Sequence, residues 1–456
     1  MTGPAEAPRP APPDLRSGRL PPEALAANFA DAHPPLSRHE AVVEAERCYF
    51  CYDAPCIEAC PTGIDIPGFI RAIATGNLRG SALTILEANI FGGACARACP
   101  TEVLCQGACV RMAEENRPVR IGLLQRHATD WLMENDPAPF THAAPTGRRV
   151  AVVGAGPAGL ACAHRLARYG HAVTVFEAKP KPGGLNEYGI AAYKVPDDFA
   201  RREVDFILGV GGIALECGRR LGRDIVMPAL LREYDAVFLG MGQAGVRALG
   251  LEGETLGGIS NAVDFIAELR QAPDKGALLV GRRVVVIGGG NTAIDAATQS
   301  RRLGAEDVTI VYRRGPAEMS ATWKEQEWAQ TNGVRIRHWA TPHRLLGESG
   351  QVMAVEFART RADSAGRMLP TGETFTLEAD MVLKAVGQVF VPDPLRQDGA
   401  LALAIENGRI AVDADRRTSL PRVYAGGDCV SGPDLTVSAV QDGKIAAEAI
   451  HRQLMG

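Results

Sequence analysis

The sequence predicts an α/β protein in which two Rossmann-like, dinucleotide-binding folds follow an α-helical, cysteine-rich segment. One observation is a repeated unit of strand, glycine-rich turn, helix and second strand. Its first copy begins at Arg149 and its second copy at Arg283. The other is the distribution of the cysteines, because eight of the 11 lie between Cys48 and Cys109. Strand–helix–strand units of this kind form parallel sheets, so we expect a parallel sheet in each copy.

The bulk composition is that of a globular, multidomain chain. Its 456 residues are enough for about three domains, and 46% of them are hydrophobic and 22% charged. The formal net charge of −4 does not indicate nucleic acid or an anionic membrane as a partner. No apolar run reaches the ~20 residues of a membrane span, and the Pro- and Ala-rich start does not resemble a secretory signal. We expect a flexible N-terminal arm over residues 1–39 and a cytoplasmic location.

The spacing of the clustered cysteines indicates iron. Disulfides are rare in a reducing cytosol, so crowded thiols there are typical of metal or redox sites. Soft thiolates at this density suit iron–sulfur clusters, and the Cys-Pro pair in each run is typical of ferredoxins. We therefore predict two [4Fe–4S] clusters; zinc, which favours well-separated ligand pairs, is the alternative. The runs are Cys48-x2-Cys51-x4-Cys56-x3-Cys60-Pro61 and Cys95-x3-Cys99-Pro100-x4-Cys105-x3-Cys109.

The surrounding segment has helical patterns over residues 69–86 and 121–132, and strands are scarce in it. The remaining cysteines, Cys162, Cys217 and Cys429, lie in or beside apolar segments. We predict that these three thiols are buried and inert.

The first glycine-rich turn has the spacing Gly154-x-Gly156-x-x-Gly159. The first glycine permits a tight turn, the second lets the backbone approach a pyrophosphate, and the third lets helix and strand pack closely. Free N–H groups at the start of the next helix attract phosphates. Glu177 ends the following strand, where its carboxylate can accept hydrogen bonds from both ribose hydroxyls. The alternative is an ordinary strand–helix turn followed by a surface glutamate.

The second turn, Gly288-Gly-Gly-Asn-Thr-Ala293, differs at the position that contacts the ribose. Arg313 and Arg314 stand where the first copy has Glu177. Two guanidinium groups suit a 2′-phosphate, which a carboxylate would repel. We therefore predict FAD at the first turn and a nicotinamide dinucleotide, NADPH before NADH, at the second. Two solvated surface arginines are the alternative.

A third motif lies near the C-terminus. Tyr424-Ala-Gly-Gly-Asp428 is a short strand that ends in Gly-Asp, and residues 437–454 have a helical pattern. A carboxylate at a strand end can hold a ribityl hydroxyl, and the start of a helix can face a phosphate. By itself this motif is a capped loop, but after an FAD-type turn it indicates the second half of a flavin site.

In this order the motifs resemble the glutamate synthase small-subunit group, which includes the N-terminal half of dihydropyrimidine dehydrogenase. The resemblance extends over residues 40–456, and residues 183–185, 194–196, 425–429 and 436–444 match the flavin-contacting motifs of the group. The closer resemblance is to the NAD(P)H-accepting subunits of bacterial dihydropyrimidine dehydrogenase. It is carried by Cys51-Tyr-Asp-Ala-Pro-Cys56, Pro61-Thr-Gly-Ile-Asp-Ile-Pro67, Asn89-Ile-Phe-Gly-Gly-Ala-Cys95 and Ile121-Gly-Leu-Leu-Gln125.

The resemblance implies a domain order, because in that group the nicotinamide domain is inserted in the flavin domain. We expect the iron–sulfur domain over residues 40–145, the FAD-binding domain over 146–280 and 389–456, and the NAD(P)H-binding domain over 281–388.

The resemblance also implies the cluster ligands. One cluster would be held by Cys48, Cys51, Cys56 and Cys109, and the other by Cys60, Cys99, Cys105 and the amide oxygen of Gln125. Cys95 would be a spare thiol. Glutamate synthase chains usually have glutamate at the position of Gln125, and a neutral amide there should raise the reduction potential of the cluster. A glutamine on the helix surface is the alternative.

No side chain is expected to act as a catalytic acid or base, because the cofactors carry the chemistry. The residues expected to bind FAD are Gly154, Gly156, Ala158, Gly159, Glu177, Gly184, Leu185, Lys194, Gly427, Asp428, Thr436 and Val437. Those expected to bind NAD(P)H are Gly288, Gly290, Asn291, Thr292, Arg313, Arg314, Ala385 and Gly387.

The implied activity is that of an FAD and iron–sulfur NAD(P)H oxidoreductase. The resemblance implies a hetero-oligomer in which an FMN-containing, iron–sulfur partner reduces uracil or thymine to the 5,6-dihydro form. Alternatives are a glutamate synthase small subunit, a ferredoxin-linked NADPH oxidoreductase subunit and, in a different class, a non-catalytic redox or zinc scaffold.

Overall fold

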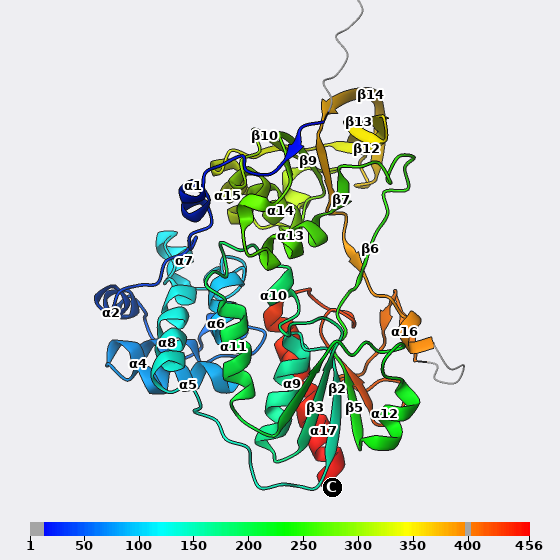
Figure 1. The fold of residues 1–456 in the computed structure, drawn as a ribbon. Coiled ribbons are helices and arrows are strands. Elements are labelled where there is room, and N and C mark those ends of the chain that lie inside the picture. The colour runs from blue at the N-terminus through cyan, green and yellow to red at the C-terminus, as the bar shows by residue number, and fades with distance from the viewer. Residues whose placement is uncertain (1–12, 397–402) are drawn as a thin grey trace, which may run out of the picture. The chain divides into compact units, whose positions relative to one another are not determined.

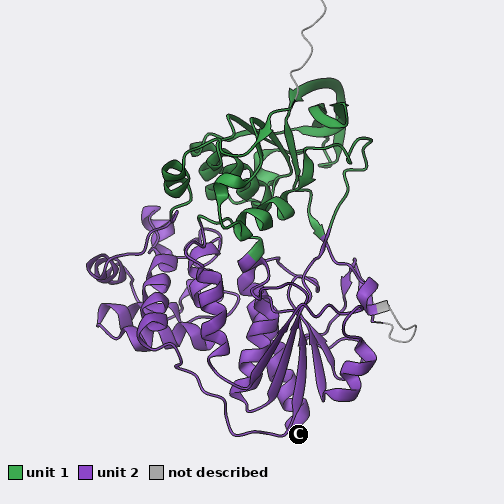
Figure 2. Ribbon diagram, in the orientation of Figure 1, with its two compact units in different colours: residues 1–30, 188–193, 246–388 green, residues 31–187, 194–245, 389–456 purple. Residues whose placement is uncertain are grey.

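The computed structural model of the chain describes residues 13–396 and 403–456. These residues divide into two compact units, shown in green and purple in Figure 2. Unit 1 contains residues 1–30, 188–193 and 246–388, and unit 2 contains residues 31–187, 194–245 and 389–456. Each unit is described by itself.

The cysteine-rich segment of unit 2 is helical, as the sequence predicts (Figure 1). The helix expected over residues 69–86 is two helices, because Gly76 has a φ of +81° and the Asn77 side chain accepts a hydrogen bond from Gly80 N at the start of the second. The helices are α2 (Arg38–Glu46), α3 (Pro55–Glu58), α4 (Ile66–Ala74), α5 (Leu78–Ala88), α6 (Gly92–Ala98), α7 (Val110–Glu115) and α8 (Ile121–Asn135).

The rest of unit 2 is built on a five-stranded parallel sheet with the order β19-β5-β2-β3-β4. The strands are β2 (Arg149–Val153), β3 (Ala172–Glu177), β4 (Ile213–Cys217), β5 (Ala236–Leu239) and β19 (Val423–Ala425). The helices are α9 (Pro157–Arg168), α10 (Leu185–Tyr188), α11 (Phe199–Leu208), α12 (Met227–Glu233), α16 (Asp393–Arg396) and α17 (Thr436–Met455), and a small pair is formed by β17 (Ile405–Glu406) and β18 (Arg409–Ile410).

Helices α9 and α17 pack against each other along the sheet of unit 2. Gly443 of α17 is buried at this contact, and a Cβ atom at that position would overlap the carbonyl oxygen of Ala158. The other side of the sheet carries Val153 and Leu239, which share a hydrophobic core with Met227 and Leu230 of α12. The central strands β2 and β5 are therefore buried on both faces, as parallel strands usually are, whereas the edge strand β4 is largely exposed.

Unit 1 has its own parallel sheet with the order β11-β10-β9-β15-β7. One face packs on α13 and α14, and the other on the antiparallel sheet β12-β13-β14. The elements are β7 (Ile259–Asn261), α13 (Ala262–Gln271), β9 (Arg283–Ile287), α14 (Asn291–Arg302), β10 (Asp307–Val311), α15 (Trp323–Thr331), β11 (Arg335–Arg337), β12 (Ala340–Glu348), β13 (Gln351–Ala362), β14 (Met368–Glu378) and β15 (Met381–Lys384). Short strands β6 (Gly245–Val246) and β16 (Gln388–Val389) occur where the chain passes between the units.

The expected flexible arm is largely ordered. Its first 12 residues lie outside the described residues, but β1 (Leu15–Arg16) pairs with β8 (Val280–Gly281), and α1 (Pro22–Asn28) packs on unit 1. Leu25 and Phe29 enter the core beside α13 and α14. The Pro- and Ala-rich composition indicates a flexible or loosely docked arm, whereas these two apolar side chains dock its described part.

The expected boundary between the first flavin segment and the nicotinamide domain also differs from the compact units. Residues 246–280 were assigned to the flavin domain, yet they pack in unit 1, because β7 pairs with β15 and α13 covers the same sheet. The segment 188–193 belongs to unit 1 as well. In sequence, the main segment of unit 1, residues 246–388, is thus inserted between β5 and β19 of unit 2, in agreement with the predicted insertion.

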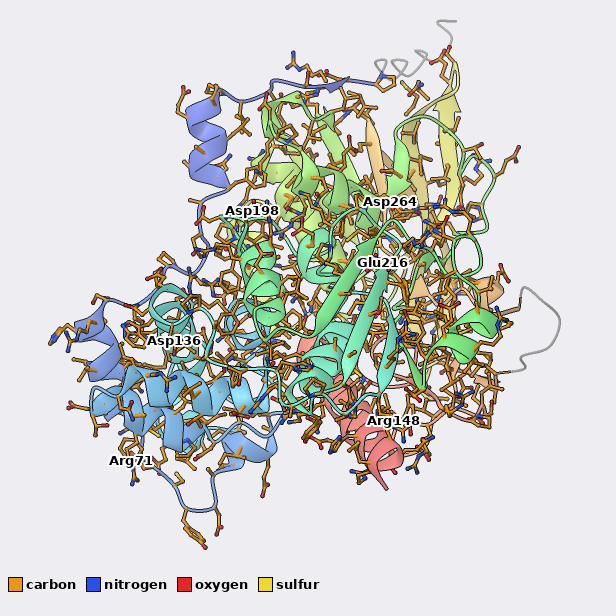
Figure 3. All side chains as sticks on the ribbon, turned by 60° about the horizontal axis from the view of Figure 1, so that its bottom comes forward. Arg71, Asp136, Arg148, Asp198, Glu216 and Asp264 are labelled. Atoms are coloured by element: carbon orange, nitrogen blue, oxygen red, sulfur yellow. The ribbon has the colours of Figure 1, made fainter. Side chains whose placement is uncertain are left out.

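Charged side chains such as Arg71, Arg148 and Glu216 are exposed, and both signs are spread over the surface (Figure 3). Within residues 13–396 and 403–456, no helix is both long enough and apolar enough to span a membrane.

Candidate cofactor-binding sites

The predicted flavin motifs meet at one edge of the unit 2 sheet. The parallel strands β2, β3, β5 and β19 all end there, which brings together Gly154, Glu177, Gly240 and Gly426. The sequence order places β3 and β5 on opposite sides of β2, so this edge is a topological switch point. Ligands of open α/β sheets bind at such points.

The three glycines of the first turn have different surroundings. Gly154 has a φ of +103°, and a Cβ atom there would overlap the carbonyl oxygen of Gly240. A Cβ atom at Gly159 would overlap the carbonyl oxygen of Gly154. At Gly156 the only neighbour of an added Cβ is Gly184 Cα at 3.8 Å, so open space lies in front of this backbone. This cradle fits the pyrophosphate of a dinucleotide at the start of α9.

Glu177 is 8% exposed, so the alternative of a surface glutamate does not hold. Its Oε2 accepts a hydrogen bond from Ala155 N and its Oε1 accepts one from Lys179 N, both at 2.8 Å. The carboxylate therefore braces the glycine turn, a role that the sequence analysis missed. Each oxygen can still accept a second hydrogen bond, which is the capacity that ribose hydroxyls require.

The C-terminal motif lies next to this turn. Gly427 has a φ of +75°, and its N–H donates to Asp442 Oδ2 at 2.9 Å. Burial raises the pKa of the Asp428 carboxyl to about 6, and the Asp434 carboxylate acts in the same direction. No hydrogen bond to the Asp428 carboxylate occurs in the described part of the chain, which leaves this group for a ligand hydroxyl.

The other predicted flavin residues lie around the same edge. Gly184 has a φ of +56°, and a Cβ atom there would stand 2.7 Å from Gly156 Cα, so the loop lies against the glycine turn. Thr436 begins α17, and its hydroxyl donates to Asn186 Oδ1 at 2.9 Å. Ala158, Lys194 and Val437 are buried, whereas Leu185 is 40% exposed.

The clustered cysteines form two neighbouring groups. Cys48, Cys51, Cys56 and Cys109 line one pocket together with apolar residues such as Ile66 and Ile121. Burial raises the pKa of the Cys56 thiol to about 12, and Cys48 and Cys109 act in the same direction. Four crowded, half-buried thiols suit a positively charged iron centre, which stabilises thiolates.

The second group contains Cys60, Cys99 and Cys105. Burial raises the pKa of the Cys105 thiol to about 12, and Cys60 adds to this effect. A hydrogen bond with Cys95 and burial both raise the pKa of Cys99. The structure thus brings together the thiols that the resemblance assigns to one cluster. In the described residues neither group is arranged as a site for a single metal ion.

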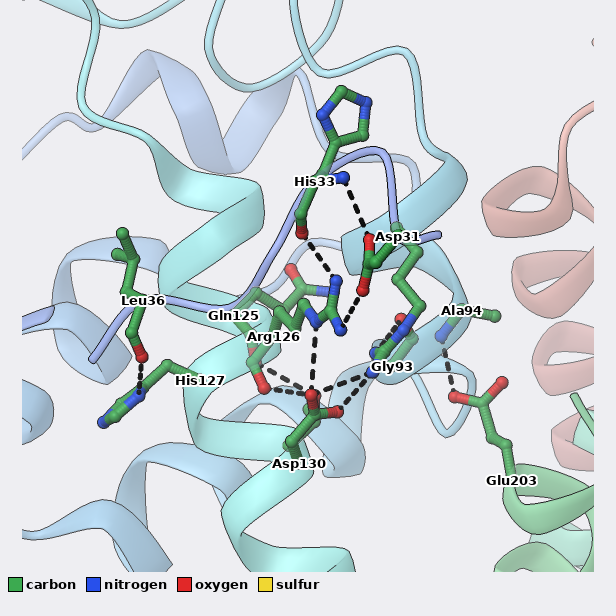
Figure 4. A network of polar contacts seen from close by, with 12 residues as sticks. Asp31, His33, Leu36, Gly93, Ala94, Gln125, Arg126, His127, Asp130 and Glu203 are labelled. Carbon is green, nitrogen blue, oxygen red and sulfur yellow. Dashed lines mark hydrogen bonds and ion pairs between the residues drawn. The ribbon is translucent and has the colours of Figure 1, made fainter. Parts of the chain in front are cut away.

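Gln125 lies on α8, which packs against α6, the helix that carries Cys95. Figure 4 shows Gln125 beside Arg126 on α8. The side chain is 7% exposed, so the alternative of a surface glutamine does not hold. Its amide nitrogen donates to Gly92 O at 2.6 Å. No hydrogen bond to the amide oxygen occurs within the described residues, and this oxygen is the atom predicted to bind iron.

An ionic network holds α6 and α8 together beside Gln125 (Figure 4). Arg97 contacts both oxygens of Asp130 at 2.8 and 2.9 Å and donates to Gly93 O at 3.1 Å. Arg126 binds Asp130 at 3.2 Å and Asp31 at 2.6 Å. These charges are partly shielded from solvent, and salt screens such pairs less than it screens exposed ones. The sequence analysis did not identify this network, because only Arg126 and Asp130 are close along the chain, whereas Arg97 and Asp31 are brought to them by the fold.

The nicotinamide motif occupies the matching sheet edge of unit 1. Gly288 has a φ of +146°, and a Cβ atom there would overlap the carbonyl oxygen of Ala385, so these two predicted residues adjoin. Gly290 and Thr292 are half-buried at the start of α14, and Gly387 is exposed. Asn291 Oδ1 is buried without a hydrogen-bond partner in the described residues. An orphan acceptor beside a helix start fits a site completed by a ligand.

Arg313 and Arg314 follow β10 and are both exposed. Their backbone carbonyls accept hydrogen bonds from Thr360 and Trp339. No ion pair to either guanidinium occurs in the described part of the chain. The two charges are thus available to a phosphate, although the alternative of solvated surface arginines has the same geometry.

Comparison with known proteins identifies the fold family. The sequence profile of the pyridine nucleotide-disulphide oxidoreductases matches residues 148–443, more than half of the chain. The chain belongs to this family. A second profile, described as dihydropyrimidine dehydrogenase domain II, 4Fe–4S cluster, matches residues 25–137. The chain is therefore an oxidoreductase with FAD and [4Fe–4S] clusters as cofactors and a nicotinamide dinucleotide as substrate, as predicted.

Two curated relatives of this oxidoreductase match along nearly their whole length. The NAD-dependent dihydropyrimidine dehydrogenase subunit PreT of Salmonella typhimurium is 36% identical, over 91% of this chain and 94% of its own. The glutamate synthase (NADPH) small chain of Escherichia coli is 34% identical, over 92% and 93%. The structure of Mycobacterium tuberculosis FprA in complex with NADPH has a TM-score of 0.56 and 23% identity over 68% of this chain and 84% of that one, which shows the fold.

The oxidoreductase has no disulfide among its 11 cysteines, all of which are free. Cys162 and Cys429 are buried, as predicted. The prediction for Cys217 was wrong, because this residue ends the edge strand β4 and its thiol is exposed.

Proposed function

We propose that this oxidoreductase is the electron-input subunit of a dihydropyrimidine dehydrogenase. It oxidises NAD(P)H and delivers electrons to an FMN-containing, iron–sulfur partner that reduces uracil or thymine to the 5,6-dihydro form. One observation carries the proposal: the glycine turn of the flavin site (residues 154–159) and both cysteine groups belong to a single compact unit. The similarity to subunit PreT supports the choice of partner.

When bound, FAD accepts a hydride and releases single electrons, and the [4Fe–4S] clusters carry single electrons. The protein supplies position. In our proposal Gly156 admits the pyrophosphate, Glu177 holds the ribose and Asp428 holds the ribityl chain. The 12 flavin residues and eight nicotinamide residues expected from the sequence keep these roles. Cys48, Cys51, Cys56 and Cys109 hold one cluster, and Cys60, Cys99, Cys105 and Gln125 hold the other.

Packing between the cysteine-rich helices and the flavin fold supports direct transfer between their cofactors. Ala94 of α6 donates its N–H to Glu203 of α11 at 2.9 Å. Arg97 of α6 stacks on the ring of Phe199, 3.5 Å from its centroid. Helix α6, which carries Cys95 and precedes Cys99, is thereby held on the flavin fold. Free thiolate ligands are kept reduced in the cytoplasm, which is where we infer that the subunit works.

The isolated chain is expected to oxidise NAD(P)H with an artificial acceptor such as ferricyanide, and to leave uracil unreduced. Both reactions are followed with the purified, anaerobically reconstituted chain, by absorbance at the nicotinamide band and by chromatography of the pyrimidine. Addition of the FMN-containing subunit should start uracil reduction. Uracil reduction by the chain alone would contradict the proposal.

The similarity to the glutamate synthase small chain supports a second candidate, a subunit that feeds electrons to an amidotransferase-type partner or a ferredoxin. Affinity purification of the native complex distinguishes the two. Recovery of an FMN-barrel chain supports the first candidate, and recovery of an amidotransferase chain supports the second.

Replacement of Arg313 and Arg314 by alanine is expected to raise the KM for NADPH by about 100-fold, because each charged hydrogen bond to a phosphate contributes about 1.5–3 kcal/mol. The KM for NADH should change by less than about threefold, since NADH lacks the 2′-phosphate. Steady-state kinetics with both dinucleotides measures the two values on one protein sample. Equal changes for both would mean that the arginines are surface charges.

A further inference from the structure

Lys444 lies on α17, the helix that follows the flavin motif. Its neighbour Gly443 is buried against α9, where a Cβ atom would overlap Ala158 O. The position of Lys444 is therefore fixed relative to the glycine turn of the flavin site. The residue is half-buried and was not among the residues expected to bind a cofactor.

The ammonium group of Lys444 reaches out of the flavin fold into the cysteine-rich segment. Its Nζ donates to Ala88 O at 3.0 Å and to Thr62 O at 3.2 Å. Ala88 is the last residue of α5, and Thr62 follows the proposed ligand Cys60 by two positions. The Thr62 hydroxyl in turn lies 3.3 Å from Cys60 Sγ. One side chain thus connects the flavin helix with the loop of a cluster ligand.

The charge of Lys444 is not neutralised by a close partner. Both of its hydrogen-bond acceptors are neutral carbonyls, and no ion pair to it occurs within residues 13–396 and 403–456. Burial lowers the pKa of Lys444, and Arg165 acts in the same direction, whereas Cys60 and Glu448 act against them. In contrast to Lys444, the buried arginines Arg97 and Arg126 each form an ion pair with Asp130, which neutralises their charge. Lys444 therefore places a positive charge close to Cys60.

We propose that Lys444 is a positioning residue that clamps the loop after Cys60 onto the flavin helix and raises the reduction potential of the cluster to which Cys60 belongs. Reduction adds one negative charge to a cluster, and a nearby positive charge in a low dielectric stabilises that reduced state. A higher potential favours electron flow from the flavin side to this cluster. The inference rests on the proposed cluster ligands and deepens the proposed function.

The test is a redox titration of the full-length, reconstituted chain, followed by electron paramagnetic resonance. Lys444→Gln and Lys444→Met remove the charge, and Lys444→Arg keeps it. Arg452→Gln removes a charge from the exposed end of the same helix and is the matched control. At a fixed solution potential, we expect Lys444→Gln and Lys444→Met to shift the reduced-to-oxidised ratio of one cluster at least tenfold toward the oxidised form. This corresponds to a reduction potential lower by about 59 mV for one electron. Arg and the control should keep the wild-type value.

Hydrogen–deuterium exchange of residues 60–64 and 86–90 measures the clamp. Exchange should rise in Lys444→Met and stay near wild type in Lys444→Arg. Wild-type potentials in fully loaded Gln and Met variants would overturn the proposal. If those two variants lose iron, Lys444→Arg decides: full loading at the wild-type potential supports the proposal, and loss of iron overturns it. Failure of the proposed function is seen separately, as wild-type protein without iron, sulfide or flavin.

Discussion

Alanine at position 156 is expected to leave the fold intact and to abolish tight FAD binding, whereas alanine at position 159 is expected to damage the fold itself. Gly156 has a φ of −81°, which alanine adopts freely, and its added Cβ meets no atom of the protein within 3.8 Å. That methyl group would occupy the space of the pyrophosphate. At Gly159 the methyl group would overlap Gly154 O, a backbone atom that cannot rotate away.

The two variants are compared by FAD content after dialysis and by thermal unfolding of the flavin-free proteins. Gly156→Ala should lower FAD affinity at least 100-fold, about 3 kcal/mol, with an apoprotein Tm close to wild type. Gly159→Ala should destabilise the apoprotein by about 1–3 kcal/mol, the usual cost of overpacking, and lose FAD as a consequence. Normal FAD retention by Gly156→Ala would show that the open space belongs to another ligand or to none.

Glu203→Gln is expected to stabilise the protein at high pH and to have little effect below pH 4.5. Glu203 is fully buried, and this burial raises the pKa of its carboxyl to about 8, although Ala94 N–H and Arg97 act against it. Between pH 4.5 and 8 the folded state therefore retains a proton that the unfolded state has released. The free energy of unfolding therefore falls as the pH rises from 4.5 to 8. Above pH 8 the Glu203 carboxyl is ionised in both states, so its contribution stays constant. Glutamine removes this loss.

The advantage of Glu203→Gln should grow from near zero at pH 4.5 to about 4 kcal/mol at pH 8, an upper limit set by one buried group. Urea unfolding of the reconstituted protein at several pH values measures the difference. Glu233→Gln, at an exposed position on α12, is the control and should show no such trend. An equal difference between variant and wild type at both ends of the pH range would mean that Glu203 does not titrate in this window.

Local sequence patterns were sufficient to predict the structure where a motif can adopt only one backbone conformation. The spacing of Gly154 and Gly159 predicts a turn that excludes side chains. In the structure a backbone carbonyl oxygen occupies the space that a Cβ atom of either residue would need. The same holds for the helical cysteine-rich segment. The two cysteine groups, by contrast, each combine residues of both runs. Cys109 of the second run lies with the first group and Cys60 of the first run with the second, so spacing alone does not assign them.

Packing between distant segments was not predictable from local patterns. Leu25 and Phe29 dock a Pro- and Ala-rich segment onto unit 1, and β7 joins the sheet of unit 1 through a pairing with β15. Glu203 lies in no recognised motif, and Lys444 ends the flavin-contacting motif 436–444, which gives no sign of a contact with the cysteine-rich segment. Their roles depend on Ala94, Thr62 and Ala88, which are brought near them only by the tertiary fold. A charged residue within an amphipathic helix has the same local pattern whether it faces solvent or a buried carbonyl.

The insertion of residues 246–388 between β5 and β19 has a consequence for synthesis. A ribosome delivers β2, α9 and β5 long before β19 and α17, although all five belong to one sheet and its covering layer. Tyr169 on one side of this gap bonds Glu448 on the other, a separation of 279 residues. Contacts so distant along the chain form slowly. We therefore expect the flavin fold to lack one strand and one covering helix until β19 and α17 have been synthesised.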